Sequence, residues 1–119
     1  MEIFTVNDAL ARLDVLNNRP IYLEGLLSFQ FEDISLNHHP RAEYRDYKSS
    51  SIWIDLNYNI LRFDSQVMNR WHGKRVMIEG ILQKPDSFFG GSGHMCLWSA
   101  SIIATEIELF KSRTRLQKQ

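Results

Sequence analysis

The 119-residue chain contains a single cysteine, Cys96, only three prolines and no long apolar run. One cysteine cannot form an internal disulfide, and the first residues lack a basic region followed by an apolar stretch. These absences predict an unsecreted, cytoplasmic protein. Because crossing a bilayer takes roughly 18 to 20 apolar residues, we also expect no membrane-spanning segment.

An excess of charge of either sign is missing as well, since 14 basic and 14 acidic residues cancel. Proteins that bind nucleic acid usually carry a clear basic excess that releases counterions from phosphates, so the balance does not favour that class. The basic residues that remain uncompensated gather at the C-terminal end. We expect residues 1–110 to form a single domain and residues 111–119 to form a polar, basic and disordered tail.

A near-repeat is the most informative feature that is present. Residues 19–27 return as residues 74–82, with Glu24-Gly25 matching Glu79-Gly80 and an apolar residue at each matching apolar position. Each copy alternates apolar and outward-facing residues before a glycine, which is the pattern of a half-buried strand with a sharp bend. Two bent strands of this kind predict a small closed barrel.

The rest of the chain divides into short elements. Leucines at helical spacing after Asn7, a residue suited to capping, predict a helix over residues 7–17. Alternation predicts strands over residues 20–31 and 51–56, and a further short strand is expected over about residues 33–37. Asp64 and Gly73 bracket a short helix that leads directly into the second copy of the repeat.

The last predicted strand covers residues 95–110. Its alternation predicts that Ile103, Thr105, Ile107 and Leu109 share one face, while Glu106 and Glu108 lie on the other. Two longer segments, residues 38–48 and 86–94, are expected to be exposed loops, and the second is rich in glycine.

Helix, three strands, helix and two strands is the element order of a mainly β fold, the OB-like five-stranded Greek-key barrel. Over residues 18–110 the chain resembles the OB-fold superfamily; another α+β roll is the alternative. More narrowly, residues 73–80 followed by Gly93-His94-Met95 and Ala100 resemble a group of small uncharacterised bacterial OB-like proteins. This resemblance implies the fold and a bacterial cytoplasmic setting, and it implies no activity.

Candidate binding residues lie in the two predicted loops and on one strand. Aromatic side chains and arginine are common anchors of protein interfaces, and here they alternate with charges of both signs. The candidates are His38, His39, Arg41, Tyr44, Arg45, Tyr47, Trp53, Phe88, Phe89 and His94. Single-stranded nucleic acid stacking on Trp53, Tyr44 and Tyr47 beside Arg45 is the alternative, although Glu43 and Asp46 cancel much of the positive field.

Catalytic and metal-binding chemistry has weaker support. His94, Cys96 and the His38-His39 pair could supply zinc ligands, but their spacing matches no standard finger. Glu24 and Glu79 could form a carboxylate pair for acid–base catalysis. Residues 90–93 are rich in glycine but lack the lysine of a phosphate-binding loop. We therefore expect no cofactor and no enzymatic activity.

The resulting hypothesis is a non-enzymatic binding module that acts through protein–protein contacts. A bacterial adaptor or a toxin-neutralising immunity protein would need only a stable scaffold and a charged recognition surface. The exposed aromatic residues could instead form the interface of a homodimer.

Overall fold

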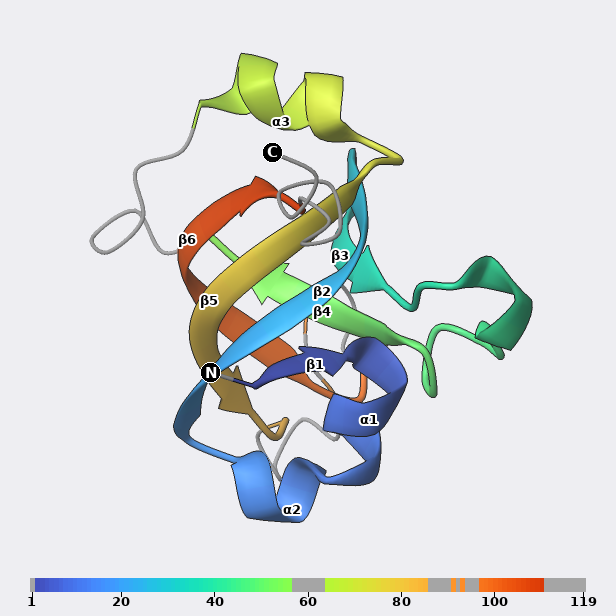
Figure 1. Ribbon diagram of the computed structural model, residues 1–119, viewed down its shortest axis with the longest axis vertical. Coiled ribbons are helices and arrows are strands. Elements are labelled where there is room, and N and C mark those ends of the chain that lie inside the picture. Colours follow the sequence, from blue (N-terminus) through green and yellow to red (C-terminus); the bar gives the residue numbers. More distant parts are fainter. Residues whose placement is uncertain (1, 57–63, 86–90, 92, 94–96, 111–119) are drawn as a thin grey trace, which may run out of the picture.

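The structure is a computed structural model that describes residues 2–56, 64–85, 91, 93 and 97–110. The predicted tail, residues 111–119, lies outside the described residues. Figure 1 shows short helices at both ends of a curved sheet. In chain order the elements are β1 (Ile3–Thr5), α1 (Val6–Ala11), α2 (Leu13–Leu16), β2 (Arg19–Gln30), β3 (Asp33–Asn37), the 3-10 turn η1 (Arg41–Glu43), β4 (Ser51–Asp55), α3 (Ser65–Trp71), β5 (Arg75–Gln83) and β6 (Ser101–Leu109).

The strands form one six-stranded sheet in the order β1-β2-β3-β4-β6-β5, and β2 also pairs with β5. This second pairing makes β2, β3, β4, β6 and β5 a ring of hydrogen-bonded strands. The fold is therefore mainly β and compatible with the predicted OB-like arrangement, but the strand count differs. The additional strand is β1, which pairs in parallel with the middle of β2.

The N-terminal segment corrects the prediction of one helix over residues 7–17. Thr5, not Asn7, caps α1, because the Thr5 hydroxyl accepts the Asp8 N–H at 3.2 Å. The helix then breaks at Arg12, which leaves α1 and α2 as two separate short helices. Phe4 of β1 is buried together with Val6, so burial of these side chains sets the course of a strand too short to recognise by alternation.

Gly25 and Gly80, where the sequence predicts sharp bends, lie at close approaches between strands. At Leu26, next to Gly25, β2 passes from pairing with β5 to pairing with β3. A β-carbon on Gly25 would lie 2.5 Å from the Asn37 carbonyl oxygen, and one on Gly80 would lie 2.4 Å from the Ile103 carbonyl oxygen. Glycine is therefore required at both sites because neighbouring backbone fills the space that a side chain needs.

The facing of β6 differs from the prediction. The register with β5 shifts between Glu79 and Gly80, whose partners are Glu106 and Ala104, so Thr105 is an extra residue on β6. Such a bulge reverses the alternation. Ile102 and Ala104 are therefore buried ahead of it, and Ile103 does not share the face of Ile107 and Leu109. The strand also begins at Ser101, and residues 95 and 96 of the predicted range lie outside the described residues.

The helix α3 agrees with its predicted boundaries. The Asp64 carboxylate accepts the backbone N–H groups of Gln66 and Val67, which caps the helix. Gly73 follows the helix with a φ of 82°, a conformation that glycine adopts without strain. No helix in the described part of the chain has both the length and the apolar character that a bilayer crossing requires.

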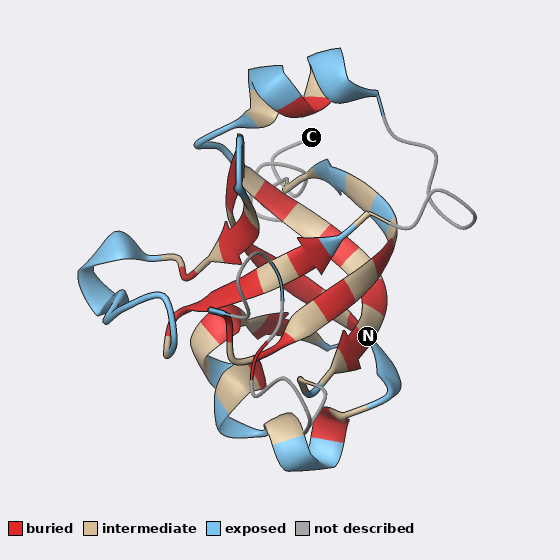
Figure 2. Ribbon diagram, turned by 180° about the vertical axis from the view of Figure 1, so that it is seen from behind, coloured by how far each residue is buried: buried red, intermediate tan, exposed pale blue. Residues whose placement is uncertain are grey.

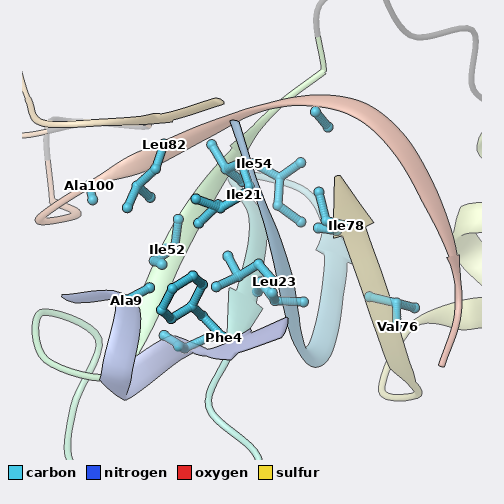
Figure 3. Close-up of a cluster of buried hydrophobic side chains, with 14 of the residues drawn as sticks. Phe4, Ala9, Ile21, Leu23, Ile52, Ile54, Val76, Ile78, Leu82 and Ala100 are labelled. Atoms are coloured by element: carbon cyan, nitrogen blue, oxygen red, sulfur yellow. The ribbon is translucent and has the colours of Figure 1, made fainter. Parts of the chain in front are cut away.

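The core fills the inside of the ring and extends under the N-terminal segment (Figure 3). Inward-facing side chains of the strands meet Phe4 and Ala9 from the segment that precedes the ring. The side chains drawn in the close-up include Ile21, Leu23, Ile52, Ile54, Val76, Ile78 and Leu82. Because β3 and β4 both contribute to this core, the segment between them is anchored at both ends by buried side chains.

Candidate functional site

The segment between β3 and β4 projects from the body of the molecule and is exposed over most of its length (Figure 2). It carries six of the residues predicted to bind a partner, namely His38, His39, Arg41, Tyr44, Arg45 and Tyr47. We call residues 38–48 the β3–β4 loop surface. Its shape depends on a set of hydrogen bonds that begins at its first residue.

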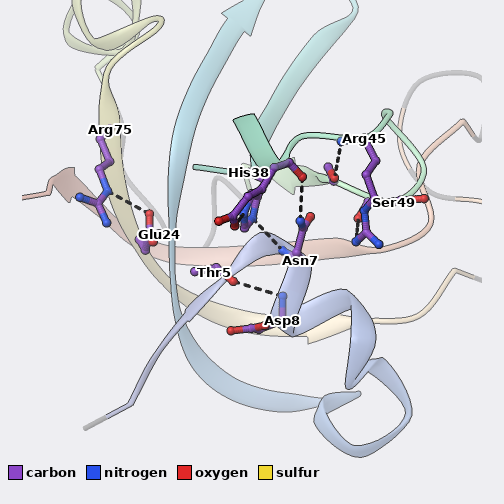
Figure 4. Close-up of polar contacts among 10 residues, drawn as sticks. Thr5, Asn7, Asp8, Glu24, His38, Arg45, Ser49 and Arg75 are labelled. Carbon is purple, nitrogen blue, oxygen red and sulfur yellow. Dashed lines mark hydrogen bonds and ion pairs between the residues drawn. The ribbon is translucent and has the colours of Figure 1, made fainter. Parts of the chain in front are cut away.

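His38 is 2% exposed and connects this loop to the N-terminal helix (Figure 4). Its Nδ1 accepts the Asn7 backbone N–H at 3.1 Å, and its Nε2 lies 2.8 Å from Oε1 of Glu43. Because Nδ1 accepts, the proton of the neutral ring is on Nε2 and is donated to the carboxylate. Both ring nitrogens of His38 therefore form hydrogen bonds, and these bonds hold the start of the β3–β4 loop surface against the N-terminal helix.

Asp46 shapes the outer turn of the same loop. Its carboxylate accepts the backbone N–H of Ser49 at 2.7 Å and that of Lys48 at 3.0 Å. These bonds, the one from Ser49 first, lower the pKa of Asp46 below its ordinary value. The Asp46 carbonyl also accepts the N–H of Ser50, and the Ser50 hydroxyl accepts the N–H of Arg45. The turn is thus a hydrogen-bonded structure, although it is exposed.

Tyr44 lines two hollows. One hollow, of about 370 Å³, is lined by Leu26, Leu27, Ser28, Asn37, His38, Arg41, Tyr44, His72 and Gly73. The other, wider and shallower at about 620 Å³, is lined by Thr5, Asn7, Asp8, Ala11, His38, Ala42, Glu43, Tyr44 and Arg45. We call the first the Arg41 pocket and the second the Arg45 hollow. Partial burial, and then the charges of Asp33 and Asp46, raise the pKa of the Tyr44 phenol.

Three aromatic rings gather beside the loop on the outer side of β4. The Trp53 and Trp98 ring centroids are 5.0 Å apart, and those of Tyr47 and Trp98 are 6.4 Å apart. The Trp98 indole N–H donates to the Ser51 hydroxyl at 2.9 Å, and Trp98 itself is buried. A β-carbon on Gly93 would lie 2.5 Å from a ring carbon of Trp53, so the chain covers part of this ring.

Some of the predicted groupings lie outside the described residues, and the predicted carboxylate pair is not formed. Phe88, Phe89 and His94 lie outside the described residues, as does Cys96, so their relation to the β3–β4 loop surface stays a prediction. Within the described ranges, no group of three His, Cys, Asp or Glu side chains could hold a metal ion. Glu24 and Glu79 are not opposite each other, since their partners across the β2–β5 pair are Met77 and Tyr22.

Two features of this region were not recognised from the sequence. Phe31 is the last residue of the predicted strand over residues 20–31, but it lies in the turn after β2 and is 89% exposed. His72 accepts the Phe29 backbone N–H and lines the Arg41 pocket. The position of His72 has no signal in the sequence, because it depends on the α3–β5 turn lying against β2.

Comparison with known proteins supports the fold and no more. Neither a protein-family model nor a curated protein matches the sequence. The structure of OBody AM3L15 bound to hen egg-white lysozyme is similar with a TM-score of 0.51 and 12% identity, over 87% of this chain and 92% of the other. A protein described as an aspartyl-tRNA synthetase from Leishmania major Friedlin is similar with a TM-score of 0.50 and 10% identity, over 91% of this chain and 20% of the other. Together with the ring of strands, these likenesses indicate an OB-like fold.

Proposed function

We propose that the chain is a non-enzymatic binding module that acts through protein–protein contacts, and that the β3–β4 loop surface recognises the partner. The observation that supports this proposal is that Tyr44 and Tyr47 extend from a turn with hydrogen-bonded polar groups. The two side chains are 39% and 42% exposed. Aromatic anchors held in this way lose little conformational freedom when a partner binds.

The chemistry of the surface supports binding over catalysis. The only buried histidine of the loop, among the residues described, has both nitrogens engaged and is not free to act as a base. The charges alternate in sign, with Arg41, Glu43 and Arg45 close in sequence, which suits a protein partner of mixed charge. In addition, the OBody is a chain of similar fold that is bound to a protein, lysozyme.

The biological form that we propose is a small bacterial, cytoplasmic adaptor or a toxin-neutralising immunity protein. Such a protein needs a stable scaffold and a variable charged surface, and it needs no cofactor.

The test is affinity capture from the native host with tagged wild-type protein and the variants Tyr44→Ala and Tyr47→Ala. We expect both variants to retain less partner, because each removes an exposed aromatic anchor. Val15→Ala is the matched control, since Val15 is 58% exposed on α2, away from the loop. If both tyrosine variants retain the same partner as wild type, the β3–β4 loop surface is not the recognition surface; Phe89→Ala tests the second predicted loop in the same way.

Single-stranded nucleic acid remains the second candidate because Tyr47, Trp98 and Trp53 cluster beside the outer face of β4. The charge on that face opposes it: β3 and β4 carry Asp33 and Asp55 and no lysine or arginine. Titration with an oligothymidine, followed by tryptophan fluorescence at low and high salt, separates nucleic-acid binding from protein binding. We expect no quenching, whereas strong quenching that disappears at high salt would favour nucleic acid.

A further inference from the structure

We propose that the Arg41 pocket receives the carboxylate side chain of an acidic residue, most suitably glutamate, from the partner protein. The inference rests on the proposed function and names the chemical group that the surface binds. Three segments far apart in the sequence form the pocket: β2 with Leu27 and Ser28, the β3–β4 loop with Arg41 and Tyr44, and the α3–β5 turn with His72.

The pocket is large enough to admit a side chain of the partner. At about 370 Å³ it lies near the lower end of the range for small-molecule sites, and Tyr44, which is 39% exposed, is among its lining residues. Leu26 and Leu27 of β2 contribute apolar lining. The methylene groups of a glutamate side chain can pack against such a wall while the carboxylate reaches the polar side.

The lining residues themselves favour an anion, although the Glu43 carboxylate lies 2.8 Å from Nε2 of His38, which is one of them. None of the lining residues is acidic, and Arg41 is the one residue among them with a permanent positive charge. Within the described part of the chain, the Arg41 guanidinium has no ion pair, whereas Arg12 pairs with Glu2 and Arg75 pairs with Glu24. An arginine that lines a pocket and has no ion pair can bind a carboxylate through two parallel N–H···O bonds.

Neighbouring groups add donors. The pKa of Tyr44 is raised, so its hydroxyl keeps its proton at neutral pH and can donate to a carboxylate. His72 Nδ1 accepts the Phe29 N–H at 3.0 Å, so the proton of the neutral ring is on Nε2. Asp33 and Asp46 act on Tyr44 from outside the pocket and oppose an incoming anion, so we expect weak, salt-sensitive binding of an isolated ligand.

The experiment is a titration of isotope-labelled protein with a blocked tripeptide, N-acetyl-Gly-Glu-Gly-amide, followed by the backbone amide signals in NMR. We expect shifts at Tyr44 and Gly73, which both line the pocket, with a Kd on the order of 1 mM. The matched peptide with glutamine in place of glutamate should bind about tenfold more weakly, because the charge-assisted bonds are lost.

Arg41→Gln and Arg45→Gln form a matched pair of variants, since both arginines lie on the same loop but line different hollows. Arg41→Gln should weaken binding of the glutamate peptide about tenfold, and Arg45→Gln should leave it within about twofold. Equal effects of the two variants, or equal binding of the two peptides, would overturn the proposal. If Tyr44→Ala still abolishes partner capture in that case, the β3–β4 loop surface stands and only the carboxylate pocket is rejected.

Discussion

Gly25 and Gly80 occupy positions where a side chain would meet backbone and not solvent. At both sites the nearest atom to an added β-carbon is a carbonyl oxygen of a neighbouring strand, which cannot rotate away as a flexible side chain could. The two glycines therefore allow strands to approach each other more closely than any other residue would permit.

Alanine at either position should consequently destabilise the protein. We expect Gly25→Ala and Gly80→Ala each to lower the free energy of unfolding by about 2–3 kcal/mol, since the strands must separate to admit a methyl group. The control is Gly73→Ala, where nothing lies within 4 Å of the added carbon and the expected cost of about 1 kcal/mol comes from a φ of 82°. Urea denaturation measures all three, and a larger loss at Gly73 than at Gly80 would contradict this account.

Tyr44 offers a second test at the scale of one residue. Its pKa is raised above the ordinary value of 10.0, first by burial and then by Asp33 and Asp46. The folded state holds the Tyr44 proton more tightly than the unfolded state does. The protonated phenol therefore adds to the free energy of unfolding below pH 10.0, and this contribution is lost as the pH rises through the raised pKa of Tyr44.

The measurement is the absorbance at 295 nm, taken as the difference between wild type and Tyr44→Phe across alkaline pH. We expect the Tyr44 midpoint above 10.0 and a smaller displacement in an Asp46→Asn background. A midpoint at or below 10.0 would show that the ring is more fully hydrated than the structure indicates.

Among the elements, β2 and β5 are connected by a charged pair as well as by their backbone. Glu24 on β2 is 5% exposed, and its Oε1 accepts the Arg75 Nε–H at 3.0 Å. The Arg75 guanidinium also lies 4.0 Å from the ring centroid of Phe110. One arginine thus connects β5 with β2, where Figure 4 shows its bond to Glu24, and with Phe110, the residue that follows β6.

Removing only the arginine should cost more than removing both charges. Arg75→Met leaves the Glu24 carboxylate buried without its partner, and we expect a loss of about 1–2 kcal/mol, at the low end because Arg75 is partly exposed. The double variant Glu24→Gln/Arg75→Met should recover part of this loss. A double-mutant cycle measured by urea denaturation gives the coupling, and strictly additive losses would mean that the pair does not stabilise the β2–β5 contact.

For the molecule as a whole, the segment before β2 is part of the core. Phe4 is 8% exposed, and Val6 and Ala9 are fully buried. Val6 lies close enough to Gly25 that an added β-carbon there would be 3.3 Å from a Val6 methyl group. This segment therefore closes the ring at one end and is not an appendage to a five-stranded domain.

Phe4→Ala should therefore weaken the entire fold. We expect the free energy of unfolding to fall by about 3 kcal/mol, as for other buried phenylalanines, with fluorescence and circular dichroism reporting one shared transition. Val15→Ala, at a residue that is 58% exposed, should change stability by less than about 0.5 kcal/mol. A local change near α1 with an unaltered global midpoint would instead make the segment an accessory to an independent ring.

The elements that could be predicted are those whose signals lie close together in the chain. Alternation located β2, β3, β4 and β5, and Asp64 with Gly73 located α3. The prediction was wrong where a distant contact changed the local pattern. Thr105 is an unpaired residue opposite the Glu79–Gly80 step, and it reversed the facing of β6 in a way that β6 alone does not reveal.

The candidate site was predictable only in part. The aromatic and arginine residues of the β3–β4 loop were recognised by type, because such side chains between polar neighbours are unlike a core pattern. The burial of His38 was not, since it follows from a bond to Asn7, 31 positions away. The Arg41 pocket likewise needs β2 and the α3–β5 turn to meet the loop.

By itself, the sequence determined a mainly β chain with a glycine in each of two repeated strands and a polar loop between two strands. Side-chain alternation, helix caps and the lack of a β-carbon act over a few bonds, so neighbouring residues suffice to read them. Only the tertiary structure decided that β1 pairs with β2 beside the ring, that β6 changes face and that Arg41 lines a pocket with no acidic partner among the described residues. These outcomes depend on which distant segments pack together and bury their apolar side chains, and that packing is determined by the complete chain.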